Sequence, residues 1–371
     1  MNGISFQAIP VQKSPVKPTD LRGILQYIPR FLKKTFVIAA DGVVVRHVNF
    51  ANLLLDIAVL HSLNIRVVLV HGAGEQITQL AKQNSITPSD LDGTGITDDA
   101  TLKLVITAAN GLTHEILEGF AANDLRAANA VAAHPFGILK GIDHQNTGKV
   151  GRVDQEMLQT FLSQGITPVI PPLGFDGEGN TFRLNSDAVA LNVAKSLQAS
   201  KLIFITGESG LMNNGEIIRQ MLGTELESLL VNRPENILTN QRSKASHSAE
   251  ACAAGVPRVH LISGLVTEGL LAEVFSNEGI GTLIYANEYR QIRAADKKDA
   301  ANILRLTREA VEQNHLRQRS EAVIEKHLDD YYLYEIDDNP VACAALRQFT
   351  NEKIGEIAHL YVNPAHGNQG I

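Results

Sequence analysis

The stretch Arg66-Val67-Val68-Leu69-Val70-His71-Gly72-Ala73-Gly74 decides the fold of this chain. Its apolar, mostly β-branched run is typical of a strand that is buried on both faces. The His-Gly-Ala-Gly segment that follows predicts a turn into a helix whose first backbone N–H groups lie at the carboxyl end of the strand. Anions bind well at such a place, but two glycines after a strand serve equally often in a plain tight turn. The stretch therefore predicts a strand–helix unit and leaves both interpretations of its turn open.

Strand and helix patterns alternate on either side of this stretch. Residues 35–38 predict a strand, and the apolar residues of 50–60 share one face of a helix, which together with 66–70 makes a βαβ unit. An Ala-rich helix is predicted at 187–197. The further predicted strands are 166–170, 201–206 and 258–263. This alternation indicates an α/β protein with a large, mostly parallel sheet in a three-layer arrangement.

The pattern changes after Tyr285. Residues 293–311 are predicted to form one amphipathic helix, and 331–336 and 341–346 are predicted to form two strands around an Asp-Asp-Asn-Pro turn. Two strands around such a turn form a hairpin, so the sheet becomes antiparallel here. The change of connectivity predicts two domains, 1–288 and 289–371, the second a partial α+β domain.

Composition narrows the class of function. The net charge of -7 gives no general attraction to nucleic acid or to an anionic membrane. Cys252 and Cys343 are the only cysteines, and their spacing suits neither a disulfide framework nor a zinc site, so we expect two buried reduced thiols. No signal peptide or run of about 20 apolar residues is present in the sequence. We therefore expect a cytoplasmic protein whose partners are small molecules or protein, with no metal ion.

The residues from 27 to 282 resemble the amino-acid-kinase fold, and in particular the N-acetylglutamate kinase and synthase branch. The resemblance is carried by Leu-Val-His-Gly-Ala-Gly (69–74), Gly-Ile-Thr-Asp (95–98), Pro-Val-Ile-Pro-Pro-Leu-Gly (168–174), Leu-Asn-Ser-Asp (184–187), His-Leu-Ile-Ser-Gly (260–264) and Glu-Gly-Ile-Gly-Thr (278–282). It implies a three-layer sheet of the amino-acid-kinase type in the first domain.

The chemistry of such kinases is missing from the sequence. Phosphoryl transfer needs cations aimed at the transferring group. Where these kinases carry a Lys and a Gly pair after the first strand, the chain reads Ala39-Ala40-Asp41-Gly42, which offers no cation and adds a carboxylate. Gly95 replaces the expected substrate-binding Arg, and 206–210 lacks the expected Asp. We therefore expect a strand end without positive charge and a non-catalytic domain.

The resemblance also implies a regulatory site, because arginine-sensitive members of the family hold arginine between an N-terminal helix, here 20–32, and the far end of the domain. The matching positions are Tyr27, Phe31, Lys244, His260, Glu278 and Gly281. Glu278 is expected to pair with the guanidinium of arginine and Lys244 with its carboxylate. The alternatives are a solvated Lys244, a capping or loop role for Glu278 and a core role for His260.

The region 293–371 resembles the first half of the GCN5-related N-acetyltransferase fold. Ile-Gly-Glu-Ile-Ala-His-Leu-Tyr-Val-Asn-Pro (354–364) matches its central strand, and the loop 365–371 lies where these enzymes cradle the pyrophosphate of coenzyme A. The implied acetyl-CoA-binding residues are His359, Leu360 and Val362 through their main chain, and Gly367, Gln369 and Gly370 in the loop. The loop lacks the usual Arg or Gln at its opening. Since the sequence stops at Ile371, we expect an incomplete site and no acetyl transfer by this chain alone.

The reaction implied by both resemblances is transfer of acetyl from acetyl-CoA to the α-amino group of L-glutamate, which makes N-acetyl-L-glutamate, the first step of arginine biosynthesis, under feedback by L-arginine. Glu356 is the candidate general base, acting directly or through water. Arg319 and Lys353 are candidates for the two carboxylates of glutamate. A solvent-facing Glu356 and two plain surface cations are the alternatives. By analogy with kinase-fold relatives, we expect a homo-oligomer.

Two other functions remain open at this point. One is an active amino-acid kinase of the N-acetylglutamate type with a C-terminal appendage, against which the absence of a Lys at Ala39 argues. The other is an arginine-binding pseudokinase module whose acetyltransferase half is vestigial.

Overall fold

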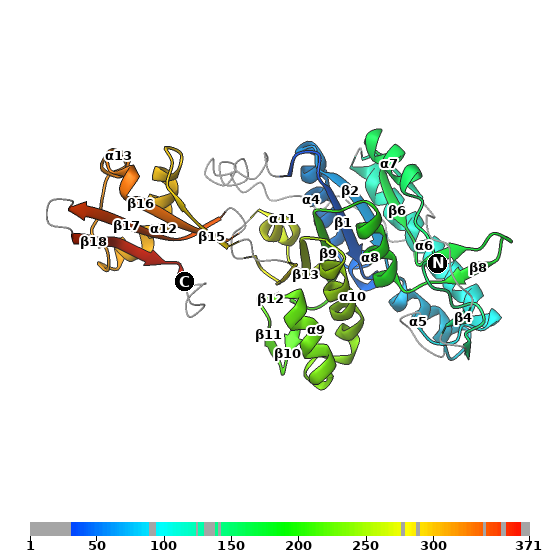
Figure 1. Ribbon diagram of the computed structural model, residues 1–371. Helices are drawn as coiled ribbons and strands as arrows, with labels where there is room; N and C mark the ends of the chain where they lie inside the picture. Colours follow the sequence, from blue (N-terminus) through cyan, green and yellow to red (C-terminus); the bar gives the residue numbers. More distant parts are fainter. Residues whose placement is uncertain are drawn as a thin grey trace. The chain divides into compact units, whose positions relative to one another are not determined.

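The structure is a computed structural model that describes residues 31–88, 94–123, 125–129, 138–139, 142–275, 279–286, 290–336, 339–349 and 354–364. The chain divides into two compact units, Met1–Ala286 and Asn287–Ile371. Figure 1 shows the elements of both units.

An eight-stranded sheet forms the centre of the first unit. Its strands, in spatial order, are β12 (Gln220–Leu222), β14 (Thr282–Tyr285), β13 (Arg258–Ser263), β9 (Lys201–Thr206), β1 (Thr35–Ala40), β2 (Arg66–His71), β6 (Thr167–Ile170) and β3 (Ala127–Asn129). The strands from β13 to β3 are mutually parallel, whereas β14 pairs antiparallel with β13 and parallel with β12. The predicted large, mostly parallel sheet is confirmed.

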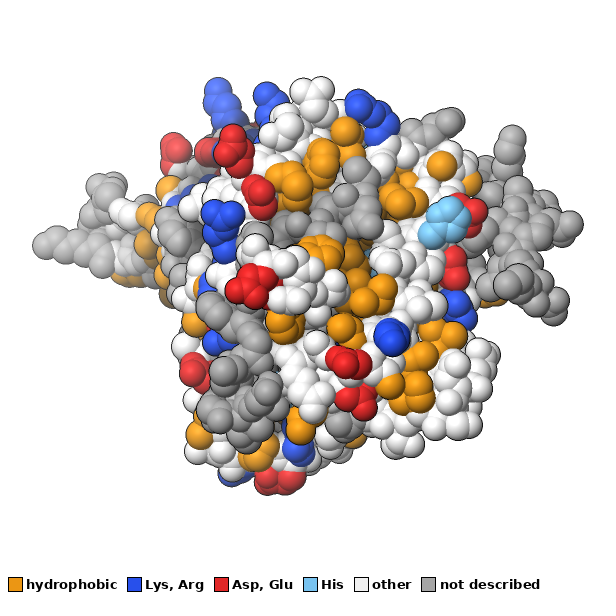
Figure 2. Space-filling model, turned by 90° about the vertical axis from the view of Figure 1, so that its right-hand side faces the viewer, with side chains coloured by type: hydrophobic (Ala, Val, Ile, Leu, Met, Phe, Trp, Pro, Cys, Tyr) orange, Lys and Arg blue, Asp and Glu red, His pale blue; other side chains and the backbone are white. Residues whose placement is uncertain are grey.

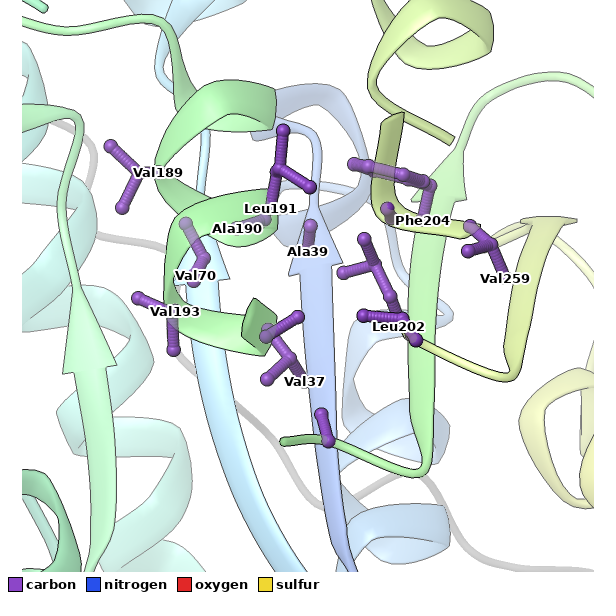
Figure 3. Packing of buried hydrophobic residues seen from close by; sticks show 14 of the residues in the cluster. Val37, Ala39, Val70, Val189, Ala190, Leu191, Val193, Leu202, Phe204 and Val259 are labelled. Carbon is purple, nitrogen blue, oxygen red and sulfur yellow. The ribbon is translucent and has the colours of Figure 1, made fainter. Parts of the chain in front are cut away.

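Helices cover both faces of this sheet because its apolar side chains alternate between them. Along β1, Val37 and Ala39 face one cluster of buried residues, and Phe36 and Ile38 face the other. Figure 3 shows the first cluster, where α8 packs over β1, β2 and β9. The helices on that face are α7 (Gln155–Ser163), α8 (Ser186–Ser196), α9 (Gly223–Asn232) and α10 (Arg242–Ala253). The helices on the other face are α3 (Gly42–Val45), α4 (Phe50–Ser62), α5 (Gly74–Gln83), α6 (Asp99–Ala122) and α11 (Gly269–Val274).

Short elements border the sheet. The antiparallel pairs are β4 (Ile138–Leu139) with β5 (Ile142–Asp143), β7 (Leu173–Phe175) with β8 (Thr181–Arg183), and β10 (Met212–Asn213) with β11 (Glu216–Ile217). Two short 3₁₀ turns, η1 (Pro234–Asn236) and η2 (Thr239–Gln241), lead into α10. The loops at the two ends of the parallel strands are therefore where polar side chains can meet.

The second unit is an antiparallel sheet with helices packed on one face. Its four strands, in spatial order, are β15 (Arg290–Ala294), β16 (Tyr331–Ile336), β17 (Asn339–Phe349) and β18 (Ile354–Val362). The other elements are α12 (Asp299–Glu312), α13 (Glu321–Lys326) and η3 (Leu328–Asp330). Tyr331 and Cys343 pack with Ile303 of α12 and Ile324 of α13 in one buried cluster. The predicted hairpin is confirmed, and its second strand is longer than predicted.

The prediction of one helix over 293–311 is wrong. Its first residues belong to β15, which pairs with β16, and the helix begins only at Asp299. The cause is an ion cluster, because the Arg293 guanidinium contacts Asp299 at 2.6 Å and Glu335 of β16 at 2.6 Å. The same carboxylate of Asp299 accepts the backbone N–H of Asp296 and so holds the turn between strand and helix.

Candidate functional site

One polar cluster lies at the carboxyl ends of the parallel strands. Asp41 follows β1, Asp187 lies in the first turn of α8, and Lys244 comes from α10. The Lys244 ammonium lies 2.9 Å from Asp41 Oδ1 and 3.1 Å from Asp187 Oδ1, and its side chain is only 12% exposed. The sequence-based expectation that this strand end carries no cation is therefore wrong. A residue more than 200 positions along the chain supplies one.

The charges in this cluster do not leave the lysine available. Burial alone would lower the pKa of Lys244, but the two carboxylates raise it above its usual value, so the side chain stays protonated. Burial raises the pKa of Asp41 against the opposing effect of Lys244. Ser243 adds a hydrogen bond of 2.7 Å to the other oxygen of Asp187. With one ammonium held between two carboxylates, the cluster has no surplus positive charge for a phosphoryl group.

A second polar cluster lies at the amino ends of the same strands. Lys201 begins β9, and its ammonium lies 2.8 Å from Nε2 of His260 in β13. His260 Nδ1 lies 2.7 Å from a carboxylate oxygen of Glu273 in α11. Because a protonated lysine only donates, Nε2 of His260 accepts and Nδ1 carries the proton that is donated to Glu273. The ring of Phe31 lies 5.3 Å from the Lys201 ammonium.

Glu273 also fixes the turn before β14. Its other oxygen accepts the backbone N–H groups of Ile280 at 2.6 Å and Gly281 at 3.0 Å. A Cβ at Gly281 would collide with the backbone carbonyl oxygen of Leu261, so this close approach requires glycine. One carboxylate thus connects α11, β13 and the turn at Gly281.

The electrostatics of the second cluster differ from those of the first. Burial lowers the pKa of Lys201 to about 8, although the Glu273 carboxylate acts in the opposite direction. Burial and the charge of Lys201 lower the pKa of His260 to about 4. Burial alone would raise the pKa of Glu273, but the hydrogen bonds from His260, Gly281 and Ile280 lower it to about 2. The cluster therefore holds a lysine whose ammonium form is destabilised and would gain from a further anion.

The structure brings together some of the predicted arginine-binding residues. Phe31, His260 and Gly281 belong to the second cluster, whereas Lys244 lies with Asp41 at the opposite strand ends. Tyr27 and Glu278 lie outside the described residues.

Sequence reasoning missed Lys201 and Glu273. Each was visible as a single charge in an apolar element, Lys-Leu-Ile-Phe-Ile-Thr (201–206) and Gly-Leu-Leu-Ala-Glu-Val (269–274). A charge in such a place is rarely buried unless it has a partner, which is the signal that was available.

In the second unit, β18 departs from regular pairing where acetyl-CoA binding was predicted. Ala345 pairs with Ala358 and Cys343 with Tyr361, so β18 has one residue more than β17 between these pairs. His359 occupies this bulge with a φ of 51°, and Leu360 next to it is 62% exposed. Among the described residues, β18 pairs only with β17, so its other edge presents backbone groups free of strand pairing.

The remaining predicted residues of this unit are spread around β18. Arg319 donates a hydrogen bond of 3.1 Å to the hydroxyl of Tyr331. Glu356 lies on β18 with its side chain 53% exposed, 3.8 Å from the guanidinium of Arg347. Val362 ends β18 and is half-buried. The predicted residues Lys353, Gly367, Gln369 and Gly370 lie outside the described residues.

The described part of the chain contains neither a membrane-spanning helix nor a cluster of metal ligands. None of its helices is long and apolar enough to cross a membrane, and none of its His, Cys, Asp and Glu side chains gather in threes as metal ligands would. On the face shown in Figure 2, positive and negative side chains are interspersed among apolar ones.

Comparison with known proteins places both units. Residues 34–263 match the Amino acid kinase family, and residues 298–371 match the Acetyltransferase (GNAT) family. The fold and these two matches define a class in which an amino-acid-kinase-type unit precedes an acetyltransferase-type unit.

Curated relatives match this chain across both units. The amino-acid acetyltransferase of Pseudomonas fluorescens strain Pf-5 is 35% identical over 367 residues, which cover 94% of this chain and 84% of the relative. The protein of that name from Pseudomonas aeruginosa strain PAO1 is 33% identical, with the same coverage. This chain belongs to the amino-acid acetyltransferase family.

Solved structures agree with this assignment. The N-acetylglutamate synthase of Neisseria gonorrhoeae complexed with coenzyme A and L-arginine has a TM-score of 0.76 and 29% identity, covering 95% of this chain and 84% of that one. The same enzyme complexed with coenzyme A and N-acetyl-glutamate has a TM-score of 0.67 and 30% identity, covering 95% and 83%.

Proposed function

We propose that this chain is an acetyl-CoA:L-glutamate N-acetyltransferase that makes N-acetyl-L-glutamate and is regulated by L-arginine. The observation that carries the proposal is the match to amino-acid acetyltransferases over 94% of the chain, because it spans both units. The complexes of the Neisseria enzyme with coenzyme A, N-acetyl-glutamate and L-arginine support the three ligand classes.

The cluster at the amino ends of the strands is the proposed arginine site. Lys201 supplies the ammonium for the carboxylate of arginine, a role that the sequence alone had suggested for Lys244. A carboxylate here would relieve the cost that burial imposes on the charged lysine. Glu273, or Glu278 as predicted from the sequence, pairs with the guanidinium, and Phe31 covers the ligand. Tyr27 keeps the role in arginine binding that the sequence predicts for it.

The edge of β18 is the proposed place of acetyl transfer. Main-chain groups of His359, Leu360 and Val362 bind the pantetheine and polarise the thioester carbonyl; the bulge frees the first two from pairing with β17, and Val362 follows it at the end of the strand. The loop glycines Gly367 and Gly370, with Gln369, keep the predicted pyrophosphate role.

The acceptor amine must lose a proton before it attacks the thioester carbon. Glu356 is the proposed base, and its carboxylate on β18, which is exposed and lies 3.8 Å from the Arg347 guanidinium, acts through a water molecule. Arg319 and Lys353 are the proposed partners of the two glutamate carboxylates, and the Arg319 guanidinium has further donors besides the one that contacts Tyr331. The thiolate of coenzyme A leaves as the amide bond forms.

An amino-acid kinase is the alternative, and the first cluster argues against it. A kinase needs a cation that faces the transferring phosphoryl group, whereas Lys244 is held by Asp41 and Asp187. A second alternative is an arginine-binding module without acetyl transfer. It would share the proposed arginine site and lack only the activity of the second unit.

The test is a mass-spectrometric assay for N-acetyl-L-glutamate with the full chain, acetyl-CoA and L-glutamate, run with and without L-arginine. Product whose rate changes with L-arginine supports the proposal. Calorimetric binding of L-arginine and acetyl-CoA without product would favour the binding module and the sequence-based expectation of an incomplete site. An acylphosphate formed from ATP and N-acetyl-L-glutamate would overturn the proposal in favour of the kinase.

We further propose a cytoplasmic homo-oligomer. The two free, buried cysteines suit a reducing compartment, and the oligomer rests on analogy with kinase-fold relatives. Light scattering of the purified chain tests the second part, and a single-chain mass would contradict it.

A further inference from the structure

A chain of hydrogen bonds runs through the buried hydroxyl of Tyr331 to the bulge of β18. Arg319 donates to this hydroxyl at 3.1 Å, and the hydroxyl lies 2.9 Å from Nδ1 of His359. The two rings meet edge to face with centroids 5.6 Å apart, and Tyr331 is fully buried. Arginine only donates, so the hydroxyl accepts from Arg319; its own proton is buried and needs an acceptor, which Nδ1 of His359 supplies. The geometry thus assigns the tautomer of His359 with its proton on Nε2.

His359 needs such support because of its backbone. Its φ of 51° lies in the left-handed region, which residues other than glycine rarely adopt and which is strained unless the surroundings fix it. The Sγ–H of Cys343 donates to the carbonyl oxygen of His359 at 3.6 Å, a weak bond. The hydrogen bond from Tyr331 is the stronger of the two side-chain interactions that hold this residue.

We propose that Tyr331, oriented by Arg319, is a positioning residue for acetyl-CoA: its hydrogen bond to His359 holds the bulge that presents the main chain of β18 to the pantetheine. This inference rests on the proposed function, and it gives Arg319 a second role besides contact with glutamate. Tyr331 itself is fully buried and touches the ligand only through His359.

The shifted pKa values of His359 and Tyr331 keep both side chains in the protonation states that their hydrogen bond requires. Burial lowers the pKa of His359 to about 4, and the charge of Arg319 acts in the same direction. The imidazole therefore stays neutral near neutral pH, and Nδ1 stays an acceptor for Tyr331. Burial raises the pKa of Tyr331 against the opposing effect of Arg319, so the hydroxyl keeps its proton.

The first test removes only the hydroxyl. In Tyr331→Phe we expect acetyl-CoA affinity of the full chain, measured by calorimetry, to fall about tenfold, because Nδ1 of His359 is left buried without a donor. Hydrogen exchange of the β18 amides should become faster by a similar factor. The matched control is Tyr332→Phe, the next residue of the same strand, whose side chain is exposed and which should match the wild type in both measurements.

The second test measures whether the hydroxyl of Tyr331 acts by stabilising the bulge at His359. Glycine adopts a positive φ without strain, so His359→Gly in the Tyr331→Phe background should restore most of the lost affinity. His359→Val should lose affinity about tenfold or more even with Tyr331 intact, because a β-branched residue disfavours this conformation. A role of Tyr331 in general stability alone would give no rescue by glycine.

The outcomes separate the two proposals. If the wild type binds acetyl-CoA and Tyr331→Phe behaves like Tyr332→Phe, the positioning role is overturned and the proposed function stands. If the wild type does not bind acetyl-CoA, the proposed function fails and the positioning role fails with it. Should Tyr331→Phe not fold, nitrogen NMR of His359 in the wild type decides, since a proton on Nδ1 would contradict the hydrogen-bond direction inferred above.

Discussion

Two lysines with little solvent exposure lie at opposite ends of the same parallel strands, and their charged surroundings differ. Lys244, at the carboxyl ends, contacts two carboxylates, Asp41 and Asp187. Lys201, at the amino ends, contacts a neutral imidazole, and the carboxylate of Glu273 lies one step further along the chain of hydrogen bonds. The pKa of Lys244 is raised, whereas that of Lys201 is lowered to about 8.

We call the cluster around Lys244 the closed site, because its ammonium already has anionic partners, and the cluster around Lys201 the receptive site, because its ammonium can bind a further anion. A buried ammonium that already has two carboxylates gains little from a ligand and loses much if its partners are displaced. A buried ammonium whose hydrogen-bond partner among the described residues is neutral, as for Lys201, gains from any carboxylate that reaches it. At the carboxyl ends of the strands, the charges of Asp41 and Asp187 therefore neutralise Lys244. At the amino ends, Lys201 can still bind an anionic ligand.

The largest predicted effect concerns the closed site. Lys244→Met should lower the free energy of unfolding by about 3 kcal/mol, because it leaves the buried carboxylate of Asp187 and the partly exposed carboxylate of Asp41 without a cation. Asp41→Asn should cost about 1 kcal/mol or less, since burial already disfavours the charged form of Asp41. Urea unfolding of the two variants measures both values. Equal losses would show that the cluster does not behave as two carboxylates sharing one lysine.

The next effect concerns ligand binding. Lys201→Met should weaken L-arginine binding by about 30- to 100-fold, which corresponds to the loss of a charged hydrogen bond. Lys244→Met, where folded, should keep arginine affinity within about threefold of the wild type. Calorimetry on both variants also decides between the two lysines as partners of the arginine carboxylate. A loss confined to Lys244→Met would restore the role that the sequence alone suggested for it.

The pH dependence of arginine binding follows from the pKa of Lys201. Because its folded-state pKa is about 8, the ammonium that receives the carboxylate is lost above that pH, and affinity should fall by up to about tenfold per pH unit there. Lys201→Arg stays charged and serves as the control, since it reports only the titration of the ligand itself. Parallel pH profiles of wild type and control would contradict this account.

The smallest effect concerns the aromatic ring above Lys201. Phe31→Leu removes the cation–π contact at 5.3 Å and should weaken arginine binding by about two- to fivefold. Phe175→Leu, at an exposed position of β7, is the control and should not change affinity. A loss as large as that in Lys201→Met would mean that Phe31 holds the ligand directly.

Local patterns predicted most of the fold. The strands β1, β2, β9 and β13 are runs of apolar residues that can be buried on both faces, and their alternation with helices leaves few arrangements other than a parallel sheet. The error at 293–311 arose because Arg293 fits a polar helix position as well as a strand, and only its contact with Glu335 of a distant strand decides between them.

The candidate sites were predicted less completely because they depend on contacts between distant residues. No local pattern shows that Lys244 meets Asp41, and the same holds for Lys201 and His260. The resemblance to known families supplied Phe31, His260 and Gly281, but it did not supply Glu273, whose role depends on the turn at Gly281. The bulge at His359 was likewise hidden, since nothing in Ile-Ala-His-Leu-Tyr (357–361) predicts a positive φ.

Nitrogen NMR of the lysine side chains tests the central claim most directly, because it observes both ammonium groups in the unmodified chain. On addition of L-arginine, we expect the Nζ resonance of Lys201 to shift and its pKa to rise from about 8, while the resonance of Lys244 stays unchanged. A response of Lys244 without one of Lys201 would contradict the assignment of the receptive and the closed strand ends.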